Sequence, residues 1–325
     1  QAAATVAMAL AAAALAGLTA GIAILLALAV FAFGRALSSI SSKDVMARTI
    51  PKGQRGQITG ISTLTSGIAA VTIGLGIRLL AGDEASVSLL ALLLAGAALA
   101  WVAGLLIYAQ IREPIAEAAR QVRSVAWWHE SWRLLSSDAP FRKFVLMRML
   151  LFVSALSPPF LIALAAEEGA SDLSGLGLFV IAQGLARMIG GRYFGRLADR
   201  SSRQLMTLGA LLASLLITAV LVLYAFTEVS GLLWFFSVGY FLLALIHTGV
   251  RVGRKTYVVD MATGDRVTQY VAVSNTVMGI LLLLTGAVNA ALALLGIEVA
   301  LAFLAALGFV GFFVGRTLPE VSARV

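Results

Sequence analysis

The sequence predicts an all-α, polytopic membrane protein, and three observations lead to this fold class. Of the 325 residues, 60% are hydrophobic and only 12% are charged, whereas roughly a quarter of the residues of a soluble domain are charged. The apolar residues form runs of about twenty, the length that a helix needs to cross ~30 Å of hydrocarbon. The apolar and polar alternation of membrane β-strands is missing from these runs. We therefore expect helices that face lipid.

Ten apolar runs are separated by polar breaks, and each predicts one membrane span. They cover residues 2–18, 21–42, 57–80, 86–109, 144–166, 173–194, 204–226, 231–253, 267–293 and 297–316. The first run is short and rich in alanine, and the sequence starts at Gln1 without an initiator methionine. We therefore expect part of the protein to precede Gln1.

The connections between the runs alternate in charge. One set carries acids without Lys or Arg: Asp83 and Glu84, then Glu167, Glu168 and Asp172, then Glu228, then Glu298. The other set is basic and comprises Lys43 to Arg55, Arg112 to Lys143, Arg192 to Arg203, Arg254 to Arg266, and Arg316 with Arg324. Basic connections stay in the cytoplasm. The pattern predicts a multi-pass protein of the plasma (inner) membrane whose first span runs outward and whose C-terminus is cytoplasmic.

Composition and spacing exclude several classes of function. The net charge of +8 resides at helix ends, where lipid and topology account for it, so we expect no nucleic-acid partner. There is no cysteine, and His129 and His247 are isolated, so no metal site is expected. The sequence has no paired nucleophile and base, no phosphate-binding loop and no carboxylate pair, so we expect neither an enzyme nor a cofactor. The expected partners are membrane lipid and a small molecule, and we expect a monomer.

The long connection from Ile111 to Phe141 divides the chain into domains. Residues 1–110 form an N-terminal half-bundle of four spans, 111–143 a cytoplasmic linker, and 144–325 a C-terminal six-helix bundle. Apolar residues recur at every third or fourth position of the linker: Ile115, Ala118, Val122, Val125, Trp128, Trp132 and Leu135. This spacing predicts a helix that lies on the membrane surface or packs on the bundle, and both readings stay open.

An internal repeat relates the two half-bundles. Arg35 is followed nine residues later by Asp44, and Arg251 nine residues later by Asp260, each pair at the cytoplasmic end of an inward-running span. A basic loop and then Ser62 or Ser274 follow in the two copies. Both copies run in the same direction, as in transporters whose halves are related by an axis normal to the membrane. Symmetry predicts two further spans upstream, twelve in all.

A short motif follows the sixth predicted span. The segment Gly195-Arg-Leu-Ala-Asp199-Arg200-Ser-Ser-Arg203-Gln204 resembles the cytoplasmic signature Gly-x-x-x-Asp-Arg-x-Gly-Arg-Arg/Lys of the major facilitator superfamily of transporters. It departs at Ser202, where the family often has glycine, and at Gln204, where it often has a cation. With the six-span halves and the long middle loop, the resemblance covers the whole chain.

The resemblance implies that this segment belongs to a conformational gate. We assign Gly195, Asp199, Arg200 and Arg203 to the gate, together with Asp44, Asp260 and Arg55. Asp199 beside the N-terminus of a neighbouring helix would gain about 0.3–1 kcal/mol from the helix dipole, and Arg200 would pair across the halves. A solvated turn is the alternative reading.

Glycines and prolines mark two further features. Gly60, Gly67, Gly74 and Gly76 share roughly one helix face, which predicts close helix contact. Many drug exporters of this family carry an antiporter signature that ends in Gly-Pro. This ending is missing here, which disfavours drug:proton antiport. In the fifth span, the pair Pro158-Pro159 predicts a kink that frees backbone carbonyls.

Polar side chains inside spans are candidates for a substrate site. Three cations, Arg35, Arg187 and Arg251, would favour an anionic solute if they converge. The other candidates are Ser38, Gln183, Tyr240, His247 and Asn275. Snorkelling of the arginines to the membrane surface is the alternative. No Asp or Glu lies near mid-membrane, so a proton or sodium coupling ion stays open.

The sequence therefore predicts a secondary active transporter that moves a small molecule, with an anion favoured, by alternating access between two half-bundles. An efflux pump for drugs or other amphipathic molecules is one alternative. A non-transporting membrane sensor or scaffold, with the Trp-rich linker as its partner surface, is the other.

Overall fold

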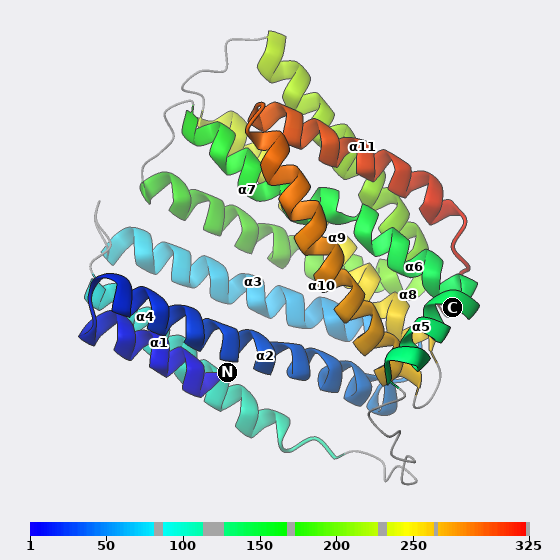
Figure 1. Ribbon diagram of the computed structural model, residues 1–325, viewed down its shortest axis with the longest axis horizontal. Coiled ribbons are helices and arrows are strands. Elements are labelled where there is room, and N and C mark those ends of the chain that lie inside the picture. Colours follow the sequence, from blue (N-terminus) through cyan, green and yellow to red (C-terminus); the bar gives the residue numbers. More distant parts are fainter. Residues whose placement is uncertain (81–86, 113–126, 168–172, 227–232, 263–265, 323–325) are drawn as a thin grey trace.

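A computed structural model describes residues 1–80, 87–112, 127–167, 173–226, 233–262 and 266–322 (Figure 1). Within these ranges the regular structure is helical throughout, without strands. The first part of the chain forms α1 (Ala2–Ala14), α2 (Gly17–Thr49), α3 (Arg55–Leu80) and α4 (Val87–Tyr108). The second part forms α5 (Trp127–Ser137), α6 (Ala139–Leu150), α7 (Phe152–Glu167), α8 (Leu173–Phe226), α9 (Leu233–Met261), α10 (Arg266–Ala293) and α11 (Ile297–Arg316). The predicted all-α fold class is confirmed.

The predicted spans fall largely on helices where the structure describes them, but the first, predicted at 2–18, is broken at Leu15 and Ala16, and its last residues belong to α2. Eight helical segments in the described ranges are long and apolar enough to cross a membrane. One of them, within α8, contains the sixth and seventh predicted spans, and α1 is shorter than these eight. The chain is thus a bundle of the kind that polytopic membrane proteins form.

The sixth and seventh spans are joined by a turn of one residue. Ser201 has φ −160° and ψ 92°, outside the helical range, and interrupts α8. Its hydroxyl accepts a hydrogen bond from the Gln204 N–H at 3.1 Å, as an N-cap side chain does. Ser201 therefore starts a new helix inside the motif, two residues after Asp199.

The fifth span is broken, but not where the prolines predict. Asp138 caps α6 by accepting from the Phe141 N–H at 2.9 Å, and α6 ends at Leu150. Leu151 separates α6 from α7, which stays helical through Pro158 and Pro159. The proline pair therefore does not end the helix, and the break in the fifth span lies at Leu151 instead.

Two helices extend well past the predicted spans. The predicted spans end at residues 42 and 253, whereas α2 runs to Thr49 and α9 runs to Met261. The extensions carry Asp44 and Asp260 on helix instead of loop. This rigid backbone holds both carboxylates at one end of the bundle.

The helices are arranged in two groups that meet along α3 (Figure 1). α1 packs against α2 and α4, while α6 to α11 pack among themselves. α3 packs along α8, and α2 contacts α9 and α10. Two large apolar cores, around Phe144 and around Phe236, lie in the second group. The packing of α3 on α8 thus joins the first part of the chain to the second.

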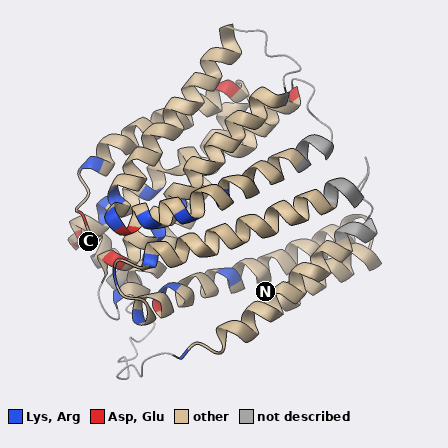
Figure 2. Cartoon of the chain, turned by 180° about the vertical axis from the view of Figure 1, so that it is seen from behind, with Lys and Arg blue, Asp and Glu red and all other residues tan. Residues whose placement is uncertain are grey.

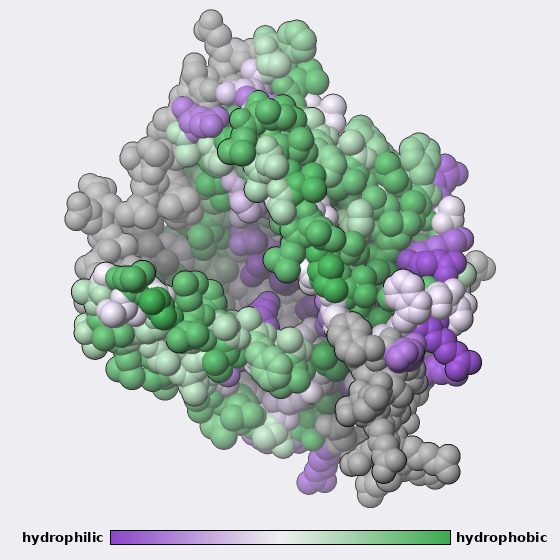
Figure 3. All heavy atoms as spheres, in the orientation of Figure 1, coloured by the Kyte–Doolittle hydropathy of each residue, from purple (hydrophilic) through white to green (hydrophobic). Residues whose placement is uncertain are grey.

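The outer surface is strongly apolar. Large side chains such as Leu294 (88% exposed), Phe226 (83%) and Leu18 (79%) are exposed on different parts of the bundle. Figure 3 shows hydrophobic surface over most of the described face. Apolar patches this extensive are not stable in water, and lipid is the solvent that suits them.

The basic residues gather at one end of the bundle. Figure 2 shows Lys and Arg concentrated near the end where the C-terminus lies. Contacts join the starts of α3 and α10, the ends of α2, α9 and α11, and the turn in α8 at this end. We call it the basic end.

Residues 113–126 of the linker lie outside the described residues, so the first part of the helix predicted from Ile115 to Leu135 cannot be compared, and α5 covers its second part. Leu134 and Leu135 of α5 pack against the core around Phe144. Trp132 is 73% exposed. The described part of the linker therefore packs on the bundle and presents one aromatic side chain outward.

Candidate functional site

A glycine seam joins α3 to α8. Gly56, Gly60 and Gly67 of α3 lie against Gly195, Gly191 and Gly184 of α8. A Cβ on Gly67 would come within 2.6 Å of the Gly184 carbonyl oxygen, closer than a side chain tolerates. Gly74 also contacts α8, whereas a Cβ on Gly76 would meet open space. The predicted glycine face thus makes the expected close contact, except at Gly76.

Asp199 caps the first turn of α3 across this seam. Its Oδ1 accepts from the Gly56 N–H at 2.7 Å and its Oδ2 from the Gln57 N–H at 2.9 Å. The residue is 4% exposed. These N–H groups have no partner within their own helix, and the helix dipole favours a carboxylate there. Asp199 lies beside a helix N-terminus, as its motif predicted.

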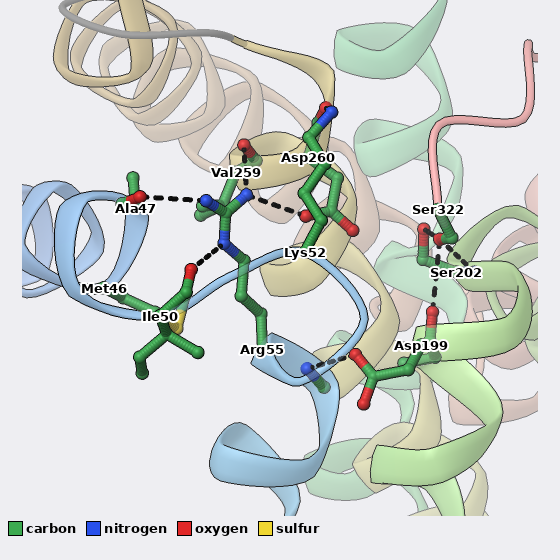
Figure 4. A network of polar contacts seen from close by, with 12 residues as sticks. Met46, Ala47, Ile50, Lys52, Arg55, Asp199, Ser202, Val259, Asp260 and Ser322 are labelled. Atoms are coloured by element: carbon green, nitrogen blue, oxygen red, sulfur yellow. Dashed lines mark hydrogen bonds and ion pairs between the residues drawn. The ribbon is translucent and has the colours of Figure 1, made fainter. Parts of the chain in front are cut away.

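Arg55, the first residue of α3, ties together the ends of two other helices (Figure 4). It donates to the carbonyls of Ala47 and Ile50 at the end of α2, each at 2.9 Å. It also donates to the Val259 carbonyl at 3.2 Å and pairs with Asp260 Oδ1 at 2.9 Å. The three carbonyls lie at helix ends, where backbone acceptors lack helical partners, so Arg55 holds α2, α3 and α9 together.

Two contacts between the groups are related as the repeat requires. Asp260 at the end of α9 pairs with Arg55 at the start of α3. Asp44 at the end of α2 accepts from the Thr268 hydroxyl near the start of α10 at 2.7 Å. α2 and α9 are predicted repeat mates, and so are α3 and α10. In each contact a carboxylate at the end of one helix thus meets the start of a helix from the other group.

The residues that follow α11 clamp the turn in α8. The Ser322 hydroxyl accepts from the Ser202 N–H at 3.0 Å and lies 2.8 Å from the Ser202 hydroxyl. Glu320 accepts from the Ser201 hydroxyl and lies 3.5 Å from Arg203. Figure 4 shows Ser322 and Ser202 close to Asp199, above it in the view. The tail thus supports the turn that aims Asp199 at α3.

Arg200 is placed differently from its prediction. It is exposed and makes no ion pair within the described part of the chain, so the predicted pairing across the halves is wrong. Successive helical side chains point about 100° apart. With Asp199 directed at α3, Arg200 is turned outward.

A hollow lies between the two groups of helices. Figure 3 shows it between α2 and α10, with hydrophilic side chains on its floor. α9 carries His247, Arg251, Arg254 and Lys255 at spacings of three and four, so these four side chains share one helix face. All four are half-buried.

Cations from four helices are gathered near one another. We call them the cation cluster: Arg35 and Lys43 on α2, Arg148 on α6, Arg187 on α8, and Arg251, Arg254 and Lys255 on α9. Arg251 is repelled by Arg187, Arg254 and Arg35. Lys43 is repelled by Arg148, Lys255 and Arg254. The charges acting on these two residues are all cations, so the cluster is uncompensated there by any described acid.

The remaining predicted substrate residues occupy different surroundings. Ser38 is exposed and accepts from the Gln1 amide at 2.8 Å. His247 lies 3.3 Å from the Ser154 hydroxyl and is repelled by Arg251. Tyr240 is 7% exposed and packs on Phe179. Gln183 is half-buried on α8, and Asn275 accepts from Arg148. The structure thus groups His247 with the cluster, and it packs the Tyr240 ring in a core close enough to Arg187 for the two to interact.

Four members of the cluster were not predicted as site residues. Lys43, Arg254 and Lys255 were assigned only to cytoplasmic connections, and Arg148 was not singled out. The spacing of His247, Arg251, Arg254 and Lys255 on one helix face was a signal that could have revealed two of them. Arg148 and Lys43 have no such signal, because only the fold brings α6 and α2 together.

Known proteins offer no closer guide to this site. No family model matches the chain, and no curated protein matches it. Within the described residues, no three His, Cys, Asp or Glu side chains are grouped so that they could hold a metal ion. The functional argument therefore rests on the geometry of the gate contacts and the cation cluster.

Proposed function

We propose that the protein is a secondary transporter of the major facilitator type, which moves a small anionic solute by alternating access between two half-bundles. The observation that carries this proposal is the cation cluster, drawn from helices on both sides of the hollow and uncompensated by described acids. We assign the cluster to the floor of the hollow. Buried like charges destabilise a fold unless a counter-charge joins them, and a solute supplies that charge.

The contacts at the basic end support alternating access. Arg55, Asp199 and Asp44 each link the first group of helices to the second. These links hold the two groups together at that end and would have to break for the solute to leave there. The resemblance of Gly195–Gln204 to the family signature assigns the same switching role to this segment.

The free energies of the gate contacts and of solute binding are consistent with alternating access. Removing one partner of a buried ion pair costs ~3–5 kcal/mol, and moving a two-state equilibrium from 1:99 to 99:1 takes ~5.5 kcal/mol of differential binding. Micromolar binding is worth about 8 kcal/mol. A solute that binds the cation cluster better in one conformation therefore supplies enough free energy to shift the gate. No chemical conversion of the solute is needed.

Transport of labelled solutes into proteoliposomes tests the proposal. We expect counterflow of small organic anions, and no counterflow of matched neutral or cationic solutes. Arg187→Gln should reduce the rate strongly, whereas Arg192→Gln, an exposed cation on the same helix, should leave it near that of the wild type. Transport of neutral solutes alone, or equal rates in the two variants, would contradict the proposal. A sensor or scaffold would show no counterflow of any solute.

A further inference from the structure

Arg148 on α6 is held rigidly by α10. Its Nη1 donates to the Ser274 hydroxyl oxygen at 2.8 Å and to Asn275 Oδ1 at 3.4 Å, and its Nη2 donates to Asn275 Oδ1 at 3.3 Å. The Ser274 hydroxyl donates in turn to the Val271 carbonyl at 3.2 Å, so its oxygen is free to accept. The guanidinium also lies 5.8 Å from the Phe144 ring centre. These partners fix the orientation of the guanidinium plane.

One donor of this fixed guanidinium is left over. The Nε atom of Arg148 is buried and has no hydrogen-bond partner. A guanidinium presents its donors as a planar fork that matches the oxygens of a carboxylate or phosphate. Within the described residues no such oxygen faces Nε. An unpaired, buried and charged donor is costly, which indicates an oxyanion ligand.

Arg148 lies beside cations from both sides of the hollow. Lys43 of α2 feels the charge of Arg148, and Arg148 feels the charge of Arg254. Arg254 also acts on Arg251, which is repelled by Arg187. Arg254 therefore joins two groups of cations, one around Arg148 and one around Arg251. One negative charge would leave most of these cations uncompensated.

We propose that Arg148, with Lys43, forms a second anion subsite, and that the solute carries two separate acidic groups. One group binds the Nε edge of Arg148, and the other binds beside Arg251 and Arg187. Arg254 lies between them. This inference rests on the proposed function and names its substrate class: small dianions such as dicarboxylates. Ser274 and Asn275 act as positioning residues for Arg148.

Matched ligand pairs test the inference on the whole purified protein in detergent. Glutarate and pentanoate have the same number of carbons but differ by one carboxylate, and calorimetric titration compares their affinities. We expect glutarate to bind at least about tenfold more tightly, which is the effect of one charge-assisted contact. Arg148→Gln should remove most of that difference, because it should weaken glutarate binding much more than pentanoate binding. Lys143→Gln, an exposed cation on the same helix, should alter neither affinity.

Other outcomes overturn the inference. The inference is wrong if the wild type binds both acids equally or binds neither. It is also wrong if Arg148→Gln weakens the binding of both acids equally. If Arg148→Gln does not fold, Arg148→Lys keeps the charge without the fork, and it should still reduce the difference between the two acids. Counterflow of monoanions without any preference for dianions would refute the second subsite but keep the proposed function. Absence of all anion counterflow would refute both.

Discussion

The guanidinium of Arg55 on α3 lies 2.9 Å from the carboxylate of Asp260 on α9, and the two side chains are only 8% and 1% exposed. Oδ2 of the same carboxylate is buried without a partner. The pair lies at the basic end, where α2, α3 and α9 meet (Figure 4). This contact joins the two groups of helices through one buried pair of charges.

Substitution of both partners should destabilise the protein by less than the sum of the two single substitutions. Arg55→Met leaves Asp260 buried and unpaired, which costs about 3–5 kcal/mol. The double variant Arg55→Met/Asp260→Leu removes both charges and should lose less than the sum of the single variants. Unfolding in detergent measures each stability, with Arg196→Gln as the exposed control. Additive losses in the double variant would show that the two side chains do not act as a pair.

Asp199→Asn should open the basic end. The amide keeps the shape of the carboxylate, but its NH₂ group faces an N–H donor and its charge no longer complements the α3 dipole. Because the protein has no cysteine, a single Ser39→Cys probe on α2 can be introduced without removing other thiols. We expect an impermeant maleimide added at the cytoplasmic side to label it faster in Asp199→Asn than in the parent. An unchanged rate in Asp199→Asn, or an equal increase in Arg200→Gln, would refute the role of the cap.

Much of the fold followed from hydropathy and charge. The last span was predicted at 297–316 and forms α11 over those residues, because Gly296 and Arg316 mark its ends. The turn at Ser201 was too short to leave a loop in the helix pattern, so its single non-helical residue was not predicted. The break at Leu151 has no glycine or proline signal. Pro158 and Pro159, which predicted a kink, lie inside α7.

The sequence identified the gate residues more completely than the residues of the cation cluster. Asp44, Asp260 and Arg55 were singled out by the repeat and the motif, but their pairing depends on which helix ends meet. Arg148 and Lys43 lie far apart in the chain, and hydropathy gives no reason to associate them. Tyr240 was a candidate substrate residue because it is a polar side chain inside a span, yet packing on Phe179 buries its ring in a core. Which side chains come together in a site depends on how the helices pack.

The C-terminal tail should stabilise the turn in α8. Ser322→Ala removes the acceptor of the buried Ser202 N–H and leaves that donor unpaired, which costs about 1–3 kcal/mol. We expect lower thermal stability and faster labelling of the Ser39→Cys probe, since Asp199 lies just before this turn. Thr317→Ala, an exposed hydroxyl in the same segment, is the control. If the two variants behave alike, the tail does not support the gate.

The glycine seam should tolerate no side chain where the backbones touch. A Cβ on Gly67 would lie 2.6 Å from the Gly184 carbonyl oxygen and 2.7 Å from the Met188 nitrogen. Both are backbone atoms that cannot rotate away, so Gly67→Ala must push α3 from α8. Overpacking of this kind costs typically 1–3 kcal/mol.

Gly76→Ala makes the same change on the same helix, but its Cβ would meet open space. In soluble helices Ala is favoured over Gly by roughly 1 kcal/mol, so this variant should be neutral or stabilising. Thermal unfolding should therefore separate the two alanine variants in opposite directions. Because α3 and α8 come from different halves, Gly67→Ala should also slow counterflow. Equal stabilities for the two variants would show that α3 and α8 are not in direct backbone contact.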